Sequence, residues 1–175
     1  SIVRLNADGS VDGTFNSGLG IRTYGGTQGS VNAIEIQGDG KIIVAGDFIQ
    51  VGATNRNNIA RLNADGTVDT TFDSGAGANG VINALALQTD GNILVGGAFN
   101  TYNGLAYPYI ARLTPSGKLD SSFSPGTGPR ARGAGAVNGG CCREVLGDQQ
   151  KIIYHWLNMR PTACFRGPAE ICRAL

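Results

Sequence analysis

The chain has 175 residues, of which 28 are glycine and only 15% are charged, and its formal net charge is +1. This length corresponds to about one domain. The high glycine content and the few charges favour a turn-rich β protein over a helical one. The nearly neutral charge argues against a nucleic-acid partner. No apolar run approaches the roughly 18 residues of a membrane-spanning helix, so we expect no membrane insertion.

One motif occurs three times, at residues 2–15, 59–72 and 110–123. The arginines of its copies lie 57 and then 51 residues apart. A period of this size, with short β-type segments inside it, indicates a repeat architecture built from one supersecondary unit.

Each copy of the motif has the pattern of a tight hairpin. In the second copy, Ala64-Asp65-Gly66 suits a three-residue loop, a type I turn followed by a left-handed residue at which glycine costs little. This loop places Leu62 opposite Val68. We interpret such cross-strand pairs as register pins worth about 0.2–1 kcal/mol each. The charged pairs, which form the structural signature of the repeat, are Arg4–Asp12, Arg61–Asp69 and Arg112–Asp120.

The stretch between the first two copies predicts a second hairpin. After a glycine-rich connection, expected strands at residues 31–36 and 41–44 are joined by Gly38-Asp39-Gly40. The alternation of Ile34 and Ile36 with polar or small residues predicts a strand with one buried face. The next repeat has the same pattern, with Leu85 opposite Val95 and Leu87 opposite Ile93. The six extra residues of the first connection, about 21–26, lie where an insertion costs little.

Each repeat is expected to form one antiparallel sheet of four strands, which has to stack on its copies to bury both faces. Units of about 50 residues with four strands are typical of propeller blades, whereas a parallel β-helix has shorter rungs. We therefore predict an all-β chain made of antiparallel four-stranded blades of a partial, unclosed β-propeller, about two and a half repeats with an irregular C-terminal tail. The expected units are residues 1–57, 58–108, 109–129 (the start of a third) and 130–175 (the tail).

The repeated pattern resembles the delta-60 repeat, a β-propeller-type repeat of large bacterial proteins. The resemblance covers residues 1–123 and implies a propeller, often on a surface or secreted protein. It implies an extracellular or cell-surface location, and it brings neither an activity nor catalytic residues. The matching positions in the second repeat are Arg61-Leu62, Asp65-Gly66, Asp69, Phe72, Asn83-Ala84, Gln88, Asp90-Gly91 and Phe99.

The pattern breaks down after Phe123. Residues 130–175 contain every cysteine and the single His, Trp and Met, and they carry 7 basic and 3 acidic residues against 7 and 10 before them. Two interpretations remain open: a divergent, capping last blade, or an out-of-frame reading of the blade that should follow. We favour the second because composition, charge and pattern change together. The start at Ser1, in mid-strand, likewise suggests an excised fragment.

The candidate metal and catalytic patterns are weak. The acidic turn at residues 63–69 has oxygens at three positions of a calcium loop, but Arg61 and Phe72 stand where that loop needs carboxylates. The one histidine, His155, lies in the irregular tail, so no Ser-His-Asp set is supported. No C-x-x-C spacing relates the cysteines, at 141, 142, 164 and 172, as a zinc site would favour. We assign no catalytic residue, no metal site and no cofactor.

The densest group of binding-type side chains lies at residues 99–109. Tyrosines and asparagines on a blade loop can hold a sugar or a peptide. Packing between blades, with an Asn-Gly turn at residues 103–104, is the competing and favoured interpretation. The candidate ligand-binding residues are Asn100, Tyr102, Asn103, Tyr107 and Tyr109.

The expected function is non-enzymatic: a structural or ligand-presenting propeller module of a larger bacterial surface or secreted protein. Its expected partners are other blades of that propeller, copies of itself, or a carbohydrate or protein ligand. One alternative is an oligomerising fragment that closes a propeller non-covalently, as in a phage-fibre-like binding protein. Another is a propeller enzyme such as a lyase or glycosidase, for which the sequence supplies no convergent set of catalytic groups. Two blades alone leave bare end faces, so the isolated chain should associate or be poorly ordered.

Overall fold

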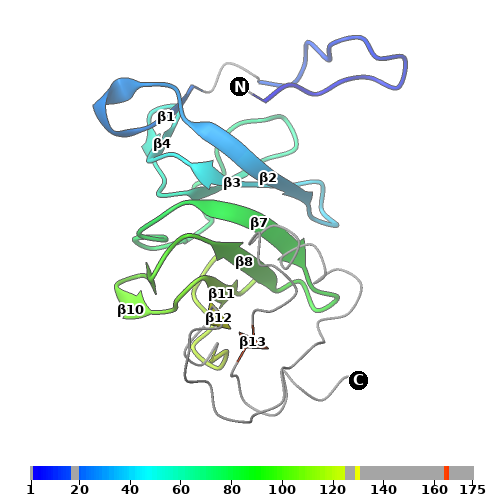
Figure 1. Cartoon of the computed structure of the whole chain (residues 1–175). Coiled ribbons are helices and arrows are strands. Elements are labelled where there is room, and N and C mark those ends of the chain that lie inside the picture. The colour runs from blue at the N-terminus through cyan, green and yellow to red at the C-terminus, as the bar shows by residue number, and fades with distance from the viewer. Residues whose placement is uncertain (1, 17–19, 125–128, 131–163, 166–175) are drawn as a thin grey trace.

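A computed structural model of the chain describes residues 2–16, 20–124, 129–130 and 164–165 (Figure 1). Within these residues the regular elements are β-strands, apart from one 3-10 turn, Tyr24–Gly26. No helix in the described part is long and apolar enough to cross a membrane. The all-β expectation is confirmed. Both interpretations of the tail concern residues that lie almost entirely outside the described part.

Two antiparallel sheets form the framework. The strands of the first sheet, in spatial order, are β2 (Ser30–Ile36), β3 (Ile42–Asp47) and β6 (Ile59–Leu62). Those of the second are, in spatial order, β11 (Ile110–Leu113), β8 (Ile93–Gly97) and β7 (Ile82–Leu87). Bridges from Leu62 to Val68 and from Leu113 to Leu119 add a fourth, outermost segment to each sheet. Figure 1 shows the two sheets stacked face to face, with β2 and β3 above β7 and β8.

Two smaller sheets, one of three short strands and one of two, extend one end of the main sheets. The structure also pairs β12 with β13. The short elements are β1 (Ile21–Arg22), β4 (Gln50–Val51), β5 (Thr54–Asn55), β9 (Thr101–Tyr102), β10 (Leu105–Ala106), β12 (Pro129–Arg130) and β13 (Cys164–Phe165).

The hairpins have the predicted register. Leu85 pairs with Val95 and Leu87 with Ile93 across β7 and β8, and bridges join Leu62 to Val68 and the two equivalent pairs in the other copies. The three-residue loop also forms, since Gly66 adopts φ 86° and its N–H donates to the carbonyl of Asn63 at 2.9 Å.

The sheets are offset from the sequence repeats. β6, which opens the second copy of the motif, pairs with β3 of the first sheet. Each sheet therefore joins the second hairpin of one repeat to the first hairpin of the next. This differs from the expectation that a sheet forms within one sequence unit. The physical reason is that the similarity between copies in the sequence gives the length of a repeat but not its first residue. Only the strand pairing shows which residues begin and end a sheet.

The insertion in the first connection lies slightly later than expected. Ile21 pairs with Val51 just as Ala78 bridges Tyr102 in the next repeat. A bridge between Arg22 and Gln28 closes a small excursion around the 3-10 turn. The extra residues therefore lie at about 23–28, at the surface, where they leave both sheets unchanged.

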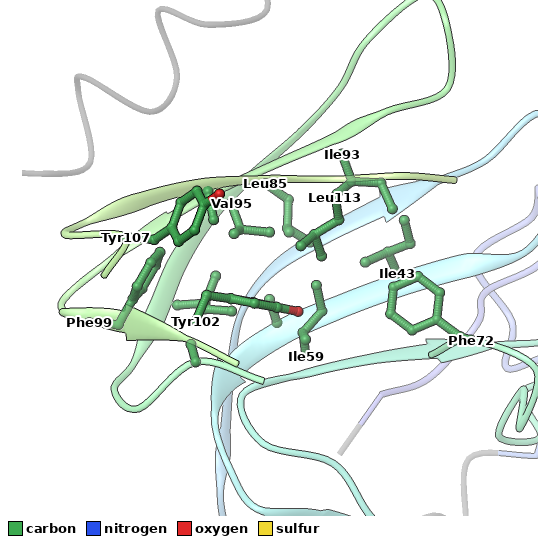
Figure 2. Packing of buried hydrophobic residues seen from close by; sticks show 14 residues of the cluster. Ile43, Ile59, Phe72, Leu85, Ile93, Val95, Phe99, Tyr102, Tyr107 and Leu113 are labelled. Atoms are coloured by element: carbon green, nitrogen blue, oxygen red, sulfur yellow. The ribbon is translucent and has the colours of Figure 1, made fainter. Parts of the chain in front are cut away.

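The largest core lies between the two sheets (Figure 2). The first sheet contributes Ile43, Ala45 and Ile59. The facing side of the second sheet has the half-buried Leu87 at one end, and its buried core residues are Ile82, Leu85, Ile93, Val95, Ala111 and Leu113. Because successive side chains of a strand point to opposite faces, the central strands β3 and β8 are buried on both sides. The other face of the first sheet packs on a smaller core formed by Phe15, Ile21, Ile42, Val44, Phe48, Val51, Ala60 and Leu62.

The prediction that Ile34 and Ile36 lie on a buried face is wrong. Their side chains are 49% and 65% exposed, whereas Leu85, 51 residues after Ile34, is 2% exposed. The pattern of β2 is that of a half-buried strand. However, no described part of the chain covers this portion of its face.

A close backbone approach beside the bulge in each sheet requires glycine. A Cβ on Gly97 would lie 2.1 Å from the carbonyl oxygen of Val81, and one on Gly46 would lie 2.0 Å from that of Ser30. We expect Gly97→Ala to lower the free energy of unfolding by about 1–3 kcal/mol, the usual cost of overpacking. Urea denaturation measures the difference. Gly13→Ala, with no atom within 4 Å of its Cβ, is the matched control, and equal effects of the two substitutions would contradict the argument.

Candidate functional site

The candidate ligand-binding residues lie on and around the β9–β10 hairpin, at the same side of the molecule in Figure 1 as β1 and β4. Thr101 and Ala106 pair across this hairpin, as do Tyr102 and Leu105. Asn103 and Gly104 adopt φ 52° and 74° at its tip, the positive values of a type I′ turn. The predicted Asn-Gly turn is therefore confirmed. The strand pairing directs neighbouring side chains to opposite faces, so the five candidates do not form one surface.

Tyr102 and Tyr107 belong to the core instead of a ligand surface. Tyr102 is fully buried and meets Phe99 edge to face, with ring centroids 6.4 Å apart. Figure 2 shows the rings of Phe99, Tyr102 and Tyr107 closing one end of the core between the sheets. Burial, and secondarily the charge of Asp73, raises the pKa of Tyr102. This corrects the expectation for these two tyrosines, because the apolar space between sheets takes up large rings at their loop ends.

The two asparagines differ in their roles. Asn103 joins the hairpin to the preceding loop, since its Oδ1 accepts from the N–H of Gly77 at 3.2 Å and its N–H donates to the carbonyl of Gly77 at 2.9 Å. Asn100 is exposed, and its backbone N–H donates to Oδ1 of Asn79 at 2.9 Å. Among the asparagine candidates, only Asn100 presents a well-exposed side chain.

Tyr109 is the candidate whose backbone is strained. It adopts φ 69°, a left-handed value that is unusual for a bulky residue. Its counterpart in the first sheet is Asn58, a residue that tolerates this conformation. The buried side chain of Asn58 donates to the carbonyl of Ala78 at 3.0 Å and accepts from the N–H of Phe48 at 3.2 Å. Tyr109 is instead 37% exposed, so the second sheet presents an aromatic ring where the first has a structural clasp.

We expect Tyr109→Asn to stabilise the fold by about 1 kcal/mol, because asparagine relieves a left-handed conformation that costs 1–2 kcal/mol for most residues. Thermal unfolding followed by circular dichroism measures the shift. Tyr107→Asn is the control and should destabilise, since its ring is buried. A lower melting temperature for Tyr109→Asn would show that the ring stabilises the fold by more than the strain costs.

The three signature pairs form, and each includes a third residue. The arginine Nε lies 2.7–2.8 Å from the aspartate Oδ2 in every copy. The guanidinium also stacks over a phenylalanine ring, at 4.9–5.1 Å from the centroid, a cation–π contact. The second carboxylate oxygen accepts from a Thr or Ser two residues later in each case. The stacked pairs are Arg4–Phe15, Arg61–Phe72 and Arg112–Phe123.

The arginines also link successive hairpins. Nη1 of Arg61 donates to the carbonyl of Pro115 at 2.8 Å and to Oε1 of Gln37 at 3.1 Å, and Nη1 of Arg4 donates to the carbonyl of Ala64. From the sequence, the arginines are expected only to hold the register within one hairpin, so their link to the next hairpin was not predicted. The sequence signal for this role was that all three copies have arginine at this position. Arginine carries several donors in a fixed planar group, whereas lysine has a single ammonium group.

The central pair is the most buried of the three. The side chains of Arg61 and Asp69 are 9% and 4% exposed, against 39% and 17% for Arg4 and Asp12. Nζ of Lys41 also donates to Oδ2 of Asp69, at 2.9 Å. Burial opposes the ionisation of Asp69, but hydrogen bonds from Thr71 and Lys41 and the charge of Arg61 outweigh it and lower its pKa. At the first hairpin, hydrogen bonds from Thr14, followed by that from Arg4, lower the pKa of Asp12 to about 2.

This network predicts a pH dependence of stability. The folded-state pKa of Asp69 lies below its unfolded value of about 3.9, so its contribution is complete above that value and is lost as the pH falls toward the folded pKa. Asp69→Asn leaves the buried Arg61 and the partly exposed Lys41 without their shared carboxylate and should cost about 3 kcal/mol at pH 7. It should also flatten the loss of stability between about pH 4 and 2. Urea denaturation across this range tests both effects, and Asp12→Asn, at the more exposed pair, should have the smaller effect at pH 7.

The described residues contain no group of three or more His, Cys, Asp or Glu side chains arranged to hold a metal ion. The acidic turn is an Asx turn, because Oδ1 of Asp65 accepts from the N–H and hydroxyl of Thr67 at 2.9 and 2.7 Å. Glu35 on β2 is a half-buried acid whose pKa is raised by burial. Its counterpart in the second sheet is Ala86, so the repeat supplies no second carboxylate of the kind that acid–base chemistry uses in pairs.

A protein-family model matches three segments of the chain, residues 1–15, 37–72 and 88–123, and its description is "Domain of unknown function (DUF5122) beta-propeller". These segments contain the arginine hairpins and the β3 and β8 strands. The matched segments are therefore similar to a β-propeller family. Comparison with curated proteins and with solved structures gives no match. We therefore name the first sheet with its outer hairpin blade 1 (residues 30–72) and the second blade 2 (residues 81–123), two blades of a partial propeller.

Proposed function

We propose that the chain is a non-enzymatic repeat module of a larger propeller, which serves as a structural or ligand-presenting part of a bacterial surface or secreted protein. The observation that supports this function is the use of the repeated residues. The apolar ones fill the core between blades, and the arginines join one hairpin to the next. The delta-60 type and the extracellular setting are supported by the resemblance of residues 1–123.

The polar residues of the repeat also support a structural role. Their donors and acceptors bind other groups of the same or the neighbouring blade, as Arg61 and Asp69 do. Active sites usually hold ionisable groups with shifted pKa values around a shared space. The acids with lowered pKa values are instead distributed over the three hairpins, two in each of the first two and one in the third, where hydrogen bonds from neighbouring residues hold them.

Ligand presentation is supported by the side chains that the blade ends expose. Tyr24, Leu105 and Tyr109 are 80%, 55% and 37% exposed, and all three lie in or beside the short strands at that end. None of them has an equivalent side chain in the other repeat. Loops that vary on a constant scaffold are the usual place for binding residues, and tyrosines suit sugars or peptides.

The structural role predicts a contrast between two leucines of blade 2. Leu85→Ala empties part of the core between blades and should cost about 2–5 kcal/mol, whereas Leu105→Ala, at an exposed site, should leave stability nearly unchanged. Urea denaturation measures both variants, and glycan and peptide arrays probed with each stable variant test presentation. Catalytic turnover of any array ligand by the purified chain would contradict the non-enzymatic proposal.

A further inference from the structure

Among the described residues, part of one face of blade 1 lacks the cover that the same part of blade 2 has. Ile34 and Ile36 on β2 are 49% and 65% exposed, while their counterparts on β7 are 2% exposed for Leu85 and half-buried for Leu87. The cover of blade 2 is blade 1 itself. The uncovered part of this face, defined by Ile34 and Ile36 and here named the open face, therefore corresponds to part of an interface that the chain already forms. The rest of the face, including Val31, packs on the smaller core.

A polar contact within that interface has a direction. Nδ2 of Asn32 donates to Oδ1 of Asn83 at 3.0 Å and to the carbonyl of Ile82 at 3.2 Å. Since a backbone carbonyl only accepts, the amide group of Asn32 has to face blade 2 with its NH₂. Asn32 and Asn83 are 51 residues apart, each at the bulge in the innermost strand of its blade. Blade 1 is thus the donor and blade 2 the acceptor.

The outer hairpins follow the same direction. Arg4 and Arg61 each donate to a turn carbonyl of the next hairpin. The N–H of Asp73 donates to the carbonyl of Ser116 at 2.9 Å, and that of Asn16 donates to the carbonyl of Asp65 at 2.7 Å. At every junction in the described chain, these donors belong to the earlier unit and the acceptors to the later one.

We propose that the open face of blade 1 binds one further sheet of this same repeat, docked head to tail, with an asparagine of that sheet donating to Oδ1 of Asn32. The inference deepens the proposed structural function and depends on it. The occupant carries an apolar face like that of Ile43, Ala45 and Ile59, which covers Ile34 and Ile36. It also carries an asparagine at the bulge of its innermost strand.

Head-to-tail docking follows from the acceptors on the open face. Oδ1 of Asn32 accepts there, at present from the hydroxyl of Ser30 at 3.2 Å, and the carbonyl of Val31 is the counterpart of that of Ile82. In a symmetric pair the open face would pack against the same face of a second copy, so the donors for these acceptors would have to come from that face. The NH₂ of Asn32 is already directed to blade 2. A sheet in the repeat direction supplies the donors instead.

The direction is tested first within the native chain, with two matched substitutions. Asn32→Asp replaces the donor by an oxygen that faces two acceptors, whereas Asn83→Asp keeps an acceptor for the NH₂ of Asn32. Asn32→Asp should lower the melting temperature by about 4 °C or more, as expected for the loss of two part-buried hydrogen bonds, and Asn83→Asp should lower it less. Equal or reversed shifts would contradict the assignment of blade 1 as the donor and blade 2 as the acceptor.

The occupant is tested by supplying it. Because Ile2 is the counterpart of Ile59, a copy of residues 20–58 placed directly before Ile2 adds the missing inner strands to the first hairpin in the repeat direction. In this extended chain Ile36→Lys should lower the melting temperature, and the control substitution Leu105→Lys, at an exposed position of blade 2, should not. In the native chain both substitutions should be nearly neutral. The extended chain should be more stable than the native chain. Replacing the copy of Asn32 by alanine should remove part of that gain.

The outcomes separate the inference from the function on which it rests. If Ile36→Lys is neutral in the extended chain while Leu85→Ala still destabilises the native one, the inference fails and the structural function remains. If Leu85→Ala has no effect either, both fail. A discrete dimer of the native chain that Ile36→Lys abolishes would assign the open face to a second copy and would also overturn the proposal.

Discussion

The structure depends on the burial of one sheet face by the next sheet. A four-stranded antiparallel sheet of short strands is not stable alone, because an apolar face that stays in water contributes no hydrophobic stabilisation. Stacking blade 1 on blade 2 buries Ile43 and Ile59 on one side of the interface and Leu85 and Val95 on the other. The remaining features follow from it: glycines where backbones approach, rings at the loop ends, and polar groups that need partners inside the stack.

The arginine hairpins show that the burial of the same Arg–Asp pair depends on the hairpins beside it. All three copies have the same Arg–Asp–Phe geometry, yet the side chain of Arg61 is 9% exposed and that of Arg4 39%. The middle hairpin has a hairpin on each side, and Lys41 and Gln37 add to its network. In a repeat protein, stability comes from contacts between neighbouring units as well as from each unit. The same sequence motif is therefore a surface ion pair at the first position and a buried network at the middle one.

The two blades differ most at their loop ends, outside the core that they share. Asn58 fits a left-handed backbone and clasps the next loop, whereas Tyr109 accepts strain at the same position and presents its ring. The sequence signals this difference, because a tyrosine aligns with an asparagine at this position. The sequence does not signal which tyrosines are buried. Tyr102 and Tyr107 belong to the same cluster of residues as Tyr109, but they lie in the core because the hairpin register directs them inward.

The sequence by itself determined the repeat length, the hairpin loops and their registers, and hence the all-β blade architecture. Turn residues and cross-strand partners act over a few positions, so Ala64-Asp65-Gly66 is sufficient to place Leu62 opposite Val68. Only the tertiary structure decided which hairpins share a sheet, that Arg61 reaches Pro115, and that Ile36 is exposed while Leu87 is half-buried. Local backbone geometry depends on neighbours in the chain, but burial depends on what lies against a face, and that surface comes from residues a whole repeat away.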